Sequence, residues 1–320
     1  MVHRRRPGDA LVDPPGVDTS GGARKVRPMP PGARSERDRT VQVRQVLLGL
    51  LVANLAVVGA KFVIGFASYS LAVVGDAVHS SVDAMNNLLG LAVITIAARA
   101  PDEDHPYGHT KFETLGALAI VVFLSISGFE LVKGALTRLL GGAAPIEITN
   151  VQIGILGATL AVNVVVAWYE ARRGAELGSA LLLADAAHTR ADVFVTVGVL
   201  SSVLLSRAGW GLADPIVALV VAGAVAVLAW SIVRRAVPVL VDEHAVPAPA
   251  IRSVAERVTG VASAYAIRSR GSGVHTFAEV TIAVDRRATV ESAHRIADDV
   301  ELRLRAELSL DEIVVHIEPC

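Results

Sequence analysis

Two apolar segments of the chain carry histidine and aspartate in the same order and at the same spacing. Residues 76–83 read DAVHSSVD and residues 185–192 read DAAHTRAD, so both follow the pattern D-A-x-H-x-x-x-D. In a helix, side chains four residues apart lie one turn apart on one face. Each segment is therefore expected to present an imidazole and a carboxylate together. The side chains of the two pairs are His79, Asp83, His188 and Asp192.

These side chains would supply two nitrogen and two oxygen ligands to one cation. Such a tetrahedral set suits Zn²⁺ and, less strongly, Co²⁺ or Fe²⁺. An aspartate at the centre of a membrane helix costs about 2.5–3.5 kcal/mol on insertion scales. Two matching pairs therefore favour a functional site over the structural alternative, hydrogen bonds that only hold helices together. Asp76 and Asp185 lie one turn away on the same faces. They fit ligands on the access path, interhelical bonds or, the role we favour, acceptors for the imidazole N–H groups.

The two pairs lie in the second and fifth of six long apolar segments. The 320-residue chain is 52% hydrophobic with a mean hydropathy of +0.52, and each segment reaches the roughly 20 helical residues that cross a bilayer. Lys and Arg gather before the first segment and in every second connection, which predicts that both termini are cytoplasmic. We expect the membrane to be the plasma membrane. The expected spans are near 44–66, 71–99, 112–140, 150–171, 177–206 and 212–234.

The two ends of the chain differ from its apolar middle, residues 44–235. Residues 1–43 hold many Arg, Pro and Gly but no apolar run, and are predicted to be a disordered basic tail. Residues 236–249 fit a linker. Residues 250–320 follow an α-β-β-α-β order, with alternating apolar residues over 275–285. The predicted fold class is therefore an all-α six-helix transmembrane bundle plus a small cytoplasmic α+β (α-β-β-α-β) domain.

Composition and motifs exclude several classes of protein. The net charge of −1 gives no basic field for nucleic acid. The one cysteine, Cys320, excludes an internal disulfide framework and a zinc ribbon, and argues against Cu⁺.

A membrane metalloenzyme, the remote alternative, would keep an open coordination position for water and a separate base. Four ligands without an H-E-x-x-H motif do not provide these features. We therefore expect neither enzymatic activity nor a prosthetic group. A passive channel is a third alternative.

From Val46 onward the chain resembles the cation diffusion facilitator family of zinc and related metal exporters. The resemblance rests on the paired H-x-x-x-D helices, on the segment PDEDHPYGHTKFE at residues 101–113, and on the α-β-β-α-β domain. It implies a homodimer in which each protomer has its own membrane site and the cytoplasmic domains form much of the contact. It also implies that His79, Asp83, His188 and Asp192 are the transport ligands.

A second family site corresponds to the loop between the second and third spans. Asp102, His105 and His109 occupy the matching positions. Independently of the resemblance, two histidines with nearby carboxylates form a plausible metal cluster. The alternative is a solvated charged loop with a turn at Pro106 and Gly108.

A third family site, a two-metal centre in the cytoplasmic domain, is only partly present in this sequence. His294, His316 and Glu318 occupy ligand positions, but Tyr265 and Thr281 stand where the best-known pattern has histidine. A weaker or one-metal site is expected, because phenol and hydroxyl are poor zinc ligands at neutral pH.

Lys111 and Asp242 match family positions that form a charge pair where the bundle meets the cytoplasm. An exposed pair of this kind is worth about 0–1 kcal/mol, so we expect it to set the register of the two parts rather than to add stability.

The sequence therefore predicts a transporter that moves a divalent metal out of the cytoplasm. The expected substrate is Zn²⁺, exchanged for protons by alternating access, with Fe²⁺, Co²⁺, Cd²⁺ or Mn²⁺ as alternatives. Metal and protons would compete for the same ligands, because coordination requires deprotonated side chains. The expected partners are the cation, protons, membrane lipid and a second copy of the chain.

Overall fold

The computed structural model describes residues 31–67, 71–141, 150–210, 212–273 and 275–320. Some side chains inside the helices are outside this description, among them those of residues 71–79, 82 and 83. The predicted ligands His79 and Asp83 are consequently placed by their helix alone.

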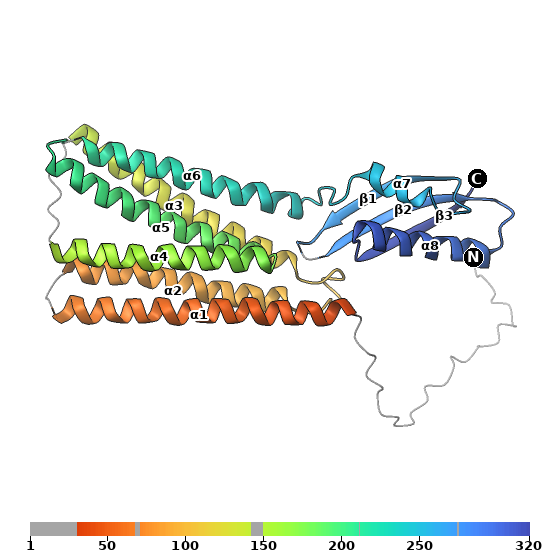
Figure 1. Ribbon diagram of the computed structural model, residues 1–320, viewed down its shortest axis with the longest axis horizontal. Coiled ribbons are helices and arrows are strands. Elements are labelled where there is room, and N and C mark those ends of the chain that lie inside the picture. The colour runs from red at the N-terminus through yellow and green to blue at the C-terminus, as the bar shows by residue number, and fades with distance from the viewer. Residues whose placement is uncertain (1–30, 68–70, 142–149, 211, 274) are drawn as a thin grey trace, which may run out of the picture.

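Six long helices run side by side and form one bundle (Figure 1). This confirms the predicted all-helical bundle. Five of the helices in the described part are long and apolar enough to cross a membrane, and the described part of the sixth is a shorter apolar helix, Ala84–Ala97. The helices are α1 (Pro31–Ala67), α2 (Leu71–Ala97), α3 (Lys111–Gly141), α4 (Asn150–Glu176), α5 (Ala180–Arg207) and α6 (Ala213–Leu240).

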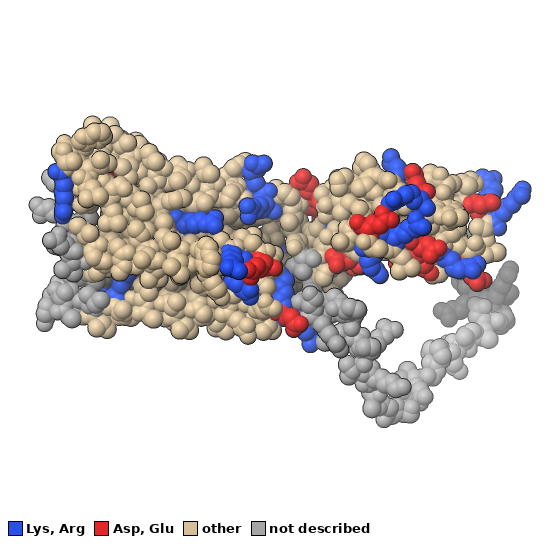
Figure 2. Space-filling model, viewed as in Figure 1, with Lys and Arg blue, Asp and Glu red and all other residues tan. Residues whose placement is uncertain are grey.

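The bundle packs as neighbouring pairs, with α1 against α2, α4 against α5, and α3 against α6. Leu47, Leu124 and Leu182 are fully buried in its core. Gly116 of α3 lies so close to α2 that a Cβ atom there would stand 2.6 Å from Val93 Cγ1. Figure 2 shows few charged residues along the visible side of the bundle and more at its ends. An apolar outer surface of this kind suits contact with lipid.

The predicted boundary of the disordered tail is wrong within the described residues. Helix α1 begins at Pro31 rather than near residue 44, so residues 31–43 are helical. Val43 is fully buried against the bundle core. Arg39 Nη2 bonds to Glu113 at 3.0 Å. These tertiary contacts hold a charged segment in a helix that its composition alone would not form. Residues 1–30 lie outside the described part of the chain.

A three-stranded sheet with two helices follows the bundle, as the α-β-β-α-β pattern predicted. The strand order is β1-β2-β3; β1 and β2 are antiparallel, while β2 and β3 are parallel. Parallel neighbours need a crossover connection, which α8 provides. Ile251, Ile282 and Leu304 are fully buried in the core of this domain. The elements are α7 (Ala248–Ala255), β1 (Ser263–Gly271), β2 (Thr276–Val284), α8 (Val290–Leu308) and β3 (Glu312–Pro319).

The C-terminal domain lies beyond the end of α6 and touches the α2–α3 loop (Figure 1). The Arg270 guanidinium stacks over the Tyr107 ring at 3.9 Å, and the Tyr107 ring meets the Phe277 ring edge at 6.0 Å. Lys111 Nζ donates to Asp242 Oδ1 at 2.8 Å. The expected charge pair therefore forms, and an aromatic contact lies beside it.

Candidate metal centre

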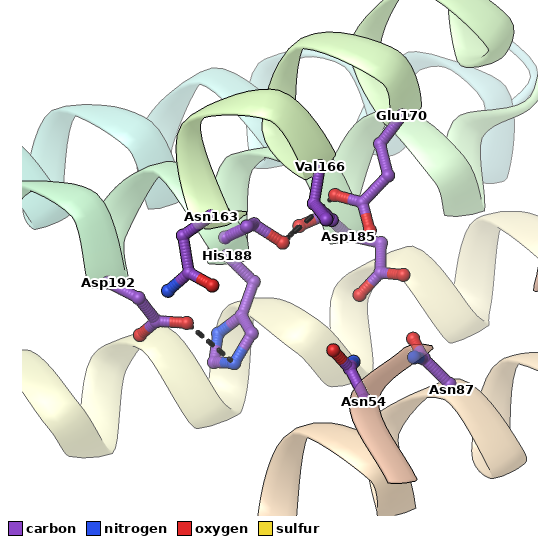
Figure 3. Close-up of a pocket in the computed structure, with 9 residues that line it drawn as sticks. Asn54, Asn87, Asn163, Val166, Glu170, Asp185, His188 and Asp192 are labelled. Atoms are coloured by element: carbon purple, nitrogen blue, oxygen red, sulfur yellow. Dashed lines mark hydrogen bonds and ion pairs between the residues drawn. The ribbon is translucent and has the colours of Figure 1, made fainter. Parts of the chain in front are cut away.

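A small polar cavity lies inside the bundle, between α1, α2, α4 and α5 (Figure 3). Its volume of about 20 Å³ admits one water-sized sphere. The predicted residues His188 and Asp192 form part of its wall, and the structure places both at a half-buried, polar position. The lining residues are Asn54, Asn87, Asn163, Val166, Glu170, Asp185, His188, Thr189 and Asp192.

The imidazole of His188 lies between a carboxylate of its own helix and an amide of α2. His188 Nε2 is 3.9 Å from Asp192 Oδ2 and 3.2 Å from Asn86 Nδ2. The first distance fits two side chains one turn apart on α5. The second joins α5 to α2 across the bundle.

Asn86 also indicates which face of α2 points toward α5. Positions 79, 83 and 86 of a helix share one face, and Asn86 on that face contacts His188. The convergence of His79 and Asp83 with the α5 pair stays a prediction, because those two side chains lie outside the described residues. Sequence reasoning missed Asn86, although its position three residues after Asp83 was a usable signal.

Glu170 of α4 is a second cavity residue that sequence reasoning missed. Its side chain is buried, with a relative exposure of 2%, and Thr189 Oγ1 donates to Glu170 Oε2 at 2.9 Å. Asp185, 6% exposed, lines the same cavity. The signal was available, since Glu170 is an acidic residue inside the expected fourth span.

The α2–α3 loop gathers its three predicted ligands. Potential ligand atoms of Asp102, His105 and His109 all lie within 4.8 Å of one another. Asp102 Oδ1 is 3.1 Å from His105 Nδ1, and Asp102 Oδ2 is 3.4 Å from His109 Nε2. The backbone N–H of His105 donates to Asp102 and is the main cause that lowers the pKa of that carboxyl. One carboxylate with two imidazoles matches the donor set of a catalytic-type zinc site, which keeps a position open.

The described histidines of the C-terminal domain do not form a three-residue cluster like that of the α2–α3 loop. Among the described residues, the loop cluster is the one group of three ligand-type side chains close enough to share an ion. His294 is paired with Asp298 at 3.8 Å, and His316 with Glu318 at 3.6 Å. Within one protomer these side chains do not form a cluster of three, and the third metal site stays a prediction.

Tyr265 forms a hydrogen bond with Glu318, one of the predicted ligands of the third site. The phenol donates to Glu318 Oε2 at 2.5 Å, and this hydrogen bond is the main cause that raises the pKa of Tyr265. The phenol is thus held in its neutral form, and one oxygen of a predicted ligand is already engaged.

Two family domains cover most of the chain. Residues 47–241 match the cation efflux transmembrane domain, and residues 248–320 match the cytoplasmic domain of cation efflux proteins. The chain belongs to the cation diffusion facilitator family. Members of this family are cation transporters rather than enzymes, so the chain is a multi-pass metal cation efflux protein.

Several known proteins are similar to most of this chain. The uncharacterized transporter MJ0449 of Methanocaldococcus jannaschii is 28% identical over 87% of this chain and 98% of its own length. The manganese efflux system protein MneP of Bacillus subtilis is 27% identical over 89% of this chain and 98% of its own length. Metal tolerance protein C1 of Arabidopsis thaliana is 32% identical over 84% of this chain and 61% of its own length. A solved MamM C-terminal domain is 32% identical over 22% of this chain and 89% of its own, with a TM-score of 0.21.

Proposed function

We propose that this cation diffusion facilitator exports Zn²⁺ from the cytoplasm in exchange for protons, with one transport site in each protomer. The contact between Asn86 and His188 carries the proposal, because it brings the ligand face of α2 to the ligand pair of α5. Two imidazoles and two carboxylates on these faces would surround one cation tetrahedrally. The small cavity beside His188 and Asp192 is large enough for one such ion.

Exchange follows from competition for the same atoms. His188 and Asp192 bind a metal only when the imidazole is neutral and the carboxylate is ionised. Protons that reach the site from the outer side occupy these atoms and release the ion. A change of the bundle between inward-open and outward-open forms, with the site near the membrane midplane, would complete the cycle.

The imidazoles favour zinc over harder ions. Histidine nitrogen suits Zn²⁺, whereas Mn²⁺ prefers oxygen ligands. MneP is named for manganese efflux, so Mn²⁺ is the competing substrate, together with Fe²⁺, Co²⁺ and Cd²⁺. A transport competition series with these ions across an imposed pH gradient would rank them.

The wider arrangement belongs to the same proposal. Both termini face the cytoplasm, the protein lies in the plasma membrane, and two copies associate through their C-terminal domains. Metal at Asp102, His105 and His109 would help to fix the loop against the C-terminal domain, since Tyr107 in the same loop stacks with Arg270.

Transport in proteoliposomes tests the proposal. A metal-sensitive dye and a pH-sensitive dye inside the vesicles should both respond when Zn²⁺ is added outside. Asp192→Ala should abolish both signals, while Glu130→Gln, which alters an exposed carboxylate on α3, should retain them. Proton movement that persists in Asp192→Ala without metal flux would defeat the shared-ligand scheme.

A further inference from the structure

Two buried carboxylates lie on the side of the cavity that faces the C-terminal domain. Glu170 is less than two turns from the end of α4 at Glu176, and Asp185 is less than two turns from the start of α5 at Ala180. The α4–α5 connection is at that end of the bundle, where Leu177 O accepts from Arg39. His188 and Asp192 lie further along α5 and therefore farther from that end of the bundle.

The donor atoms in the part of the cavity nearer the C-terminal domain are chemically different from the proposed transport ligands. Glu170 and Asp185 supply carboxylate oxygens, and Asn54 and Asn87 supply amide oxygens (Figure 3). Carboxylate, amide and water oxygens suit hard divalent cations such as Mn²⁺ and Mg²⁺. Among the described side chains, imidazole enters this cavity at His188, three residues further along α5 than Asp185.

Asn87 gives a second, independent indication of a ligand. Its side chain is 3% exposed and lines the cavity, and its Nδ2 atom is buried without a hydrogen-bond partner among the described residues. A buried amide donor left in this state is costly. Turned by half a rotation, the same amide presents its oxygen to the cation.

We propose that Glu170, Asp185, Asn54 and Asn87 form a second, all-oxygen cation site that takes a divalent cation before His188 and Asp192 receive it. This inference deepens the proposed function, on which it rests. Three residues of α5, a rise of about 4.5 Å, separate Asp185 from His188. An ion can pass that distance by exchanging its ligands one at a time. Because the cavity admits one water-sized sphere, the two positions are filled in turn.

Binding of Mn²⁺ to the full-length chain in lipid nanodiscs tests the site. Free Mn²⁺ is counted by its electron paramagnetic resonance signal, in a background that carries His105→Ala, His188→Ala and Asp192→Asn. We expect one Mn²⁺ site to remain in the bundle. Glu170→Gln should weaken it roughly 10–100-fold, as the loss of one metal-supporting group does. Glu176→Gln, an exposed carboxylate on the same helix, should leave the affinity unchanged.

Two further variants separate ligand loss from misfolding. Glu170→Asp keeps the charge and should retain more of the Mn²⁺ affinity than Glu170→Gln. Asn87→Leu keeps the volume of the side chain and should also weaken binding. Equal Mn²⁺ affinity in the background, Glu170→Gln and Asn87→Leu proteins would overturn the site, as would loss of all bundle-bound Mn²⁺ in the background protein itself.

Zn²⁺ transport and Mn²⁺ binding, measured separately, distinguish failure of this inference from failure of the proposed function. A wild-type chain without proton-coupled Zn²⁺ flux would refute the antiport, whereas Glu170-dependent Mn²⁺ binding would still establish the oxygen site. Normal Zn²⁺ flux with Mn²⁺ binding indifferent to Glu170 would refute the oxygen site alone.

Discussion

Lys111, the first residue of α3, forms an ion pair with Asp242, which lies just after the end of α6. Lys111 Nζ is 2.8 Å from Asp242 Oδ1. Asp242 adopts a left-handed backbone, with φ of 55°. This conformation turns the chain out of α6 and toward the C-terminal domain. Arg270 of β1 lies 4.0 Å from the second Asp242 oxygen. One carboxylate thus contacts both parts of the molecule.

A double-mutant cycle on this pair should give a small coupling energy. Both side chains are more than a third exposed, so Lys111→Ala and Asp242→Asn should show a coupling of about 0–1 kcal/mol in thermal unfolding. At the same position Asp242→Ala should be less stable than Asp242→Gly by about 1–2 kcal/mol, because the Cβ atom of alanine strains a left-handed backbone and glycine has none. A coupling well above this range, or an alanine variant as stable as the glycine variant, would contradict the description.

The buried pair between Arg39 and Glu113 should matter far more for stability. Glu113 is 5% exposed and also accepts a hydrogen bond from Ser179 at 2.5 Å. Arg39→Ala would leave that carboxylate buried without its partner, which typically costs about 3–5 kcal/mol. Denaturant unfolding in detergent micelles measures the loss. The matched control is Arg37→Ala, an exposed arginine of the same helix. If both variants unfold alike, the N-terminal turns of α1 do not dock as described.

The same contact shows why the sequence misplaced the start of the first helix. Residues 31–43 are charged, and local composition favours disorder. Their helix is stabilised by Glu113 and by Leu177, which are distant in the chain, and no local pattern encodes such partners. The six spans were predictable because apolar length is a local property.

The loop cluster should bind zinc and thereby stabilise the protein. With Zn²⁺ at 100 times its dissociation constant, a site that exists only in the folded state adds about 2.7 kcal/mol to stability. His105→Ala should weaken this binding roughly 10–100-fold and remove most of the zinc-dependent rise in melting temperature. Zinc titrations monitored by calorimetry, with a chelator reversal, check both values. Unaltered zinc affinity in His105→Ala would assign the loop to the solvated-turn alternative.

Candidate sites differed in how far sequence could predict them. The loop site was predictable because Asp102, His105 and His109 are close in the chain as well as in space. Asn86 and Glu170 were missed because their contacts join different helices: Asn86 of α2 meets His188 of α5, and Glu170 of α4 meets Thr189 of α5. The contact of Tyr265 on β1 with Glu318 on β3 depends on the registers of two strand pairs, β1–β2 and β2–β3, which sequence patterns do not fix.

Tyr265 should titrate at higher pH than a free tyrosine. Because Glu318 accepts a hydrogen bond from the Tyr265 hydroxyl, the pKa of Tyr265 in the folded protein lies above the ordinary value of 10.0. The stability that this bond contributes is complete below pH 10 and is lost as pH rises through the folded pKa. Ultraviolet difference titration of wild type against Tyr265→Phe measures the shift. A Tyr265 transition at or below pH 10 would show that the bond does not form in solution.

The account rests on one cation held jointly by α2 and α5, and zinc-edge X-ray absorption tests it most directly. The sample is the Zn²⁺-loaded chain with His105, His294 and His316 replaced by alanine. Two imidazole nitrogens and two carboxylate oxygens are predicted, with Zn–N distances of about 2.0–2.1 Å. The imidazole count should fall to one in His79→Ala and also in His188→Ala. An imidazole count that does not change in His79→Ala would show that α2 does not share the ion, and would contradict the account.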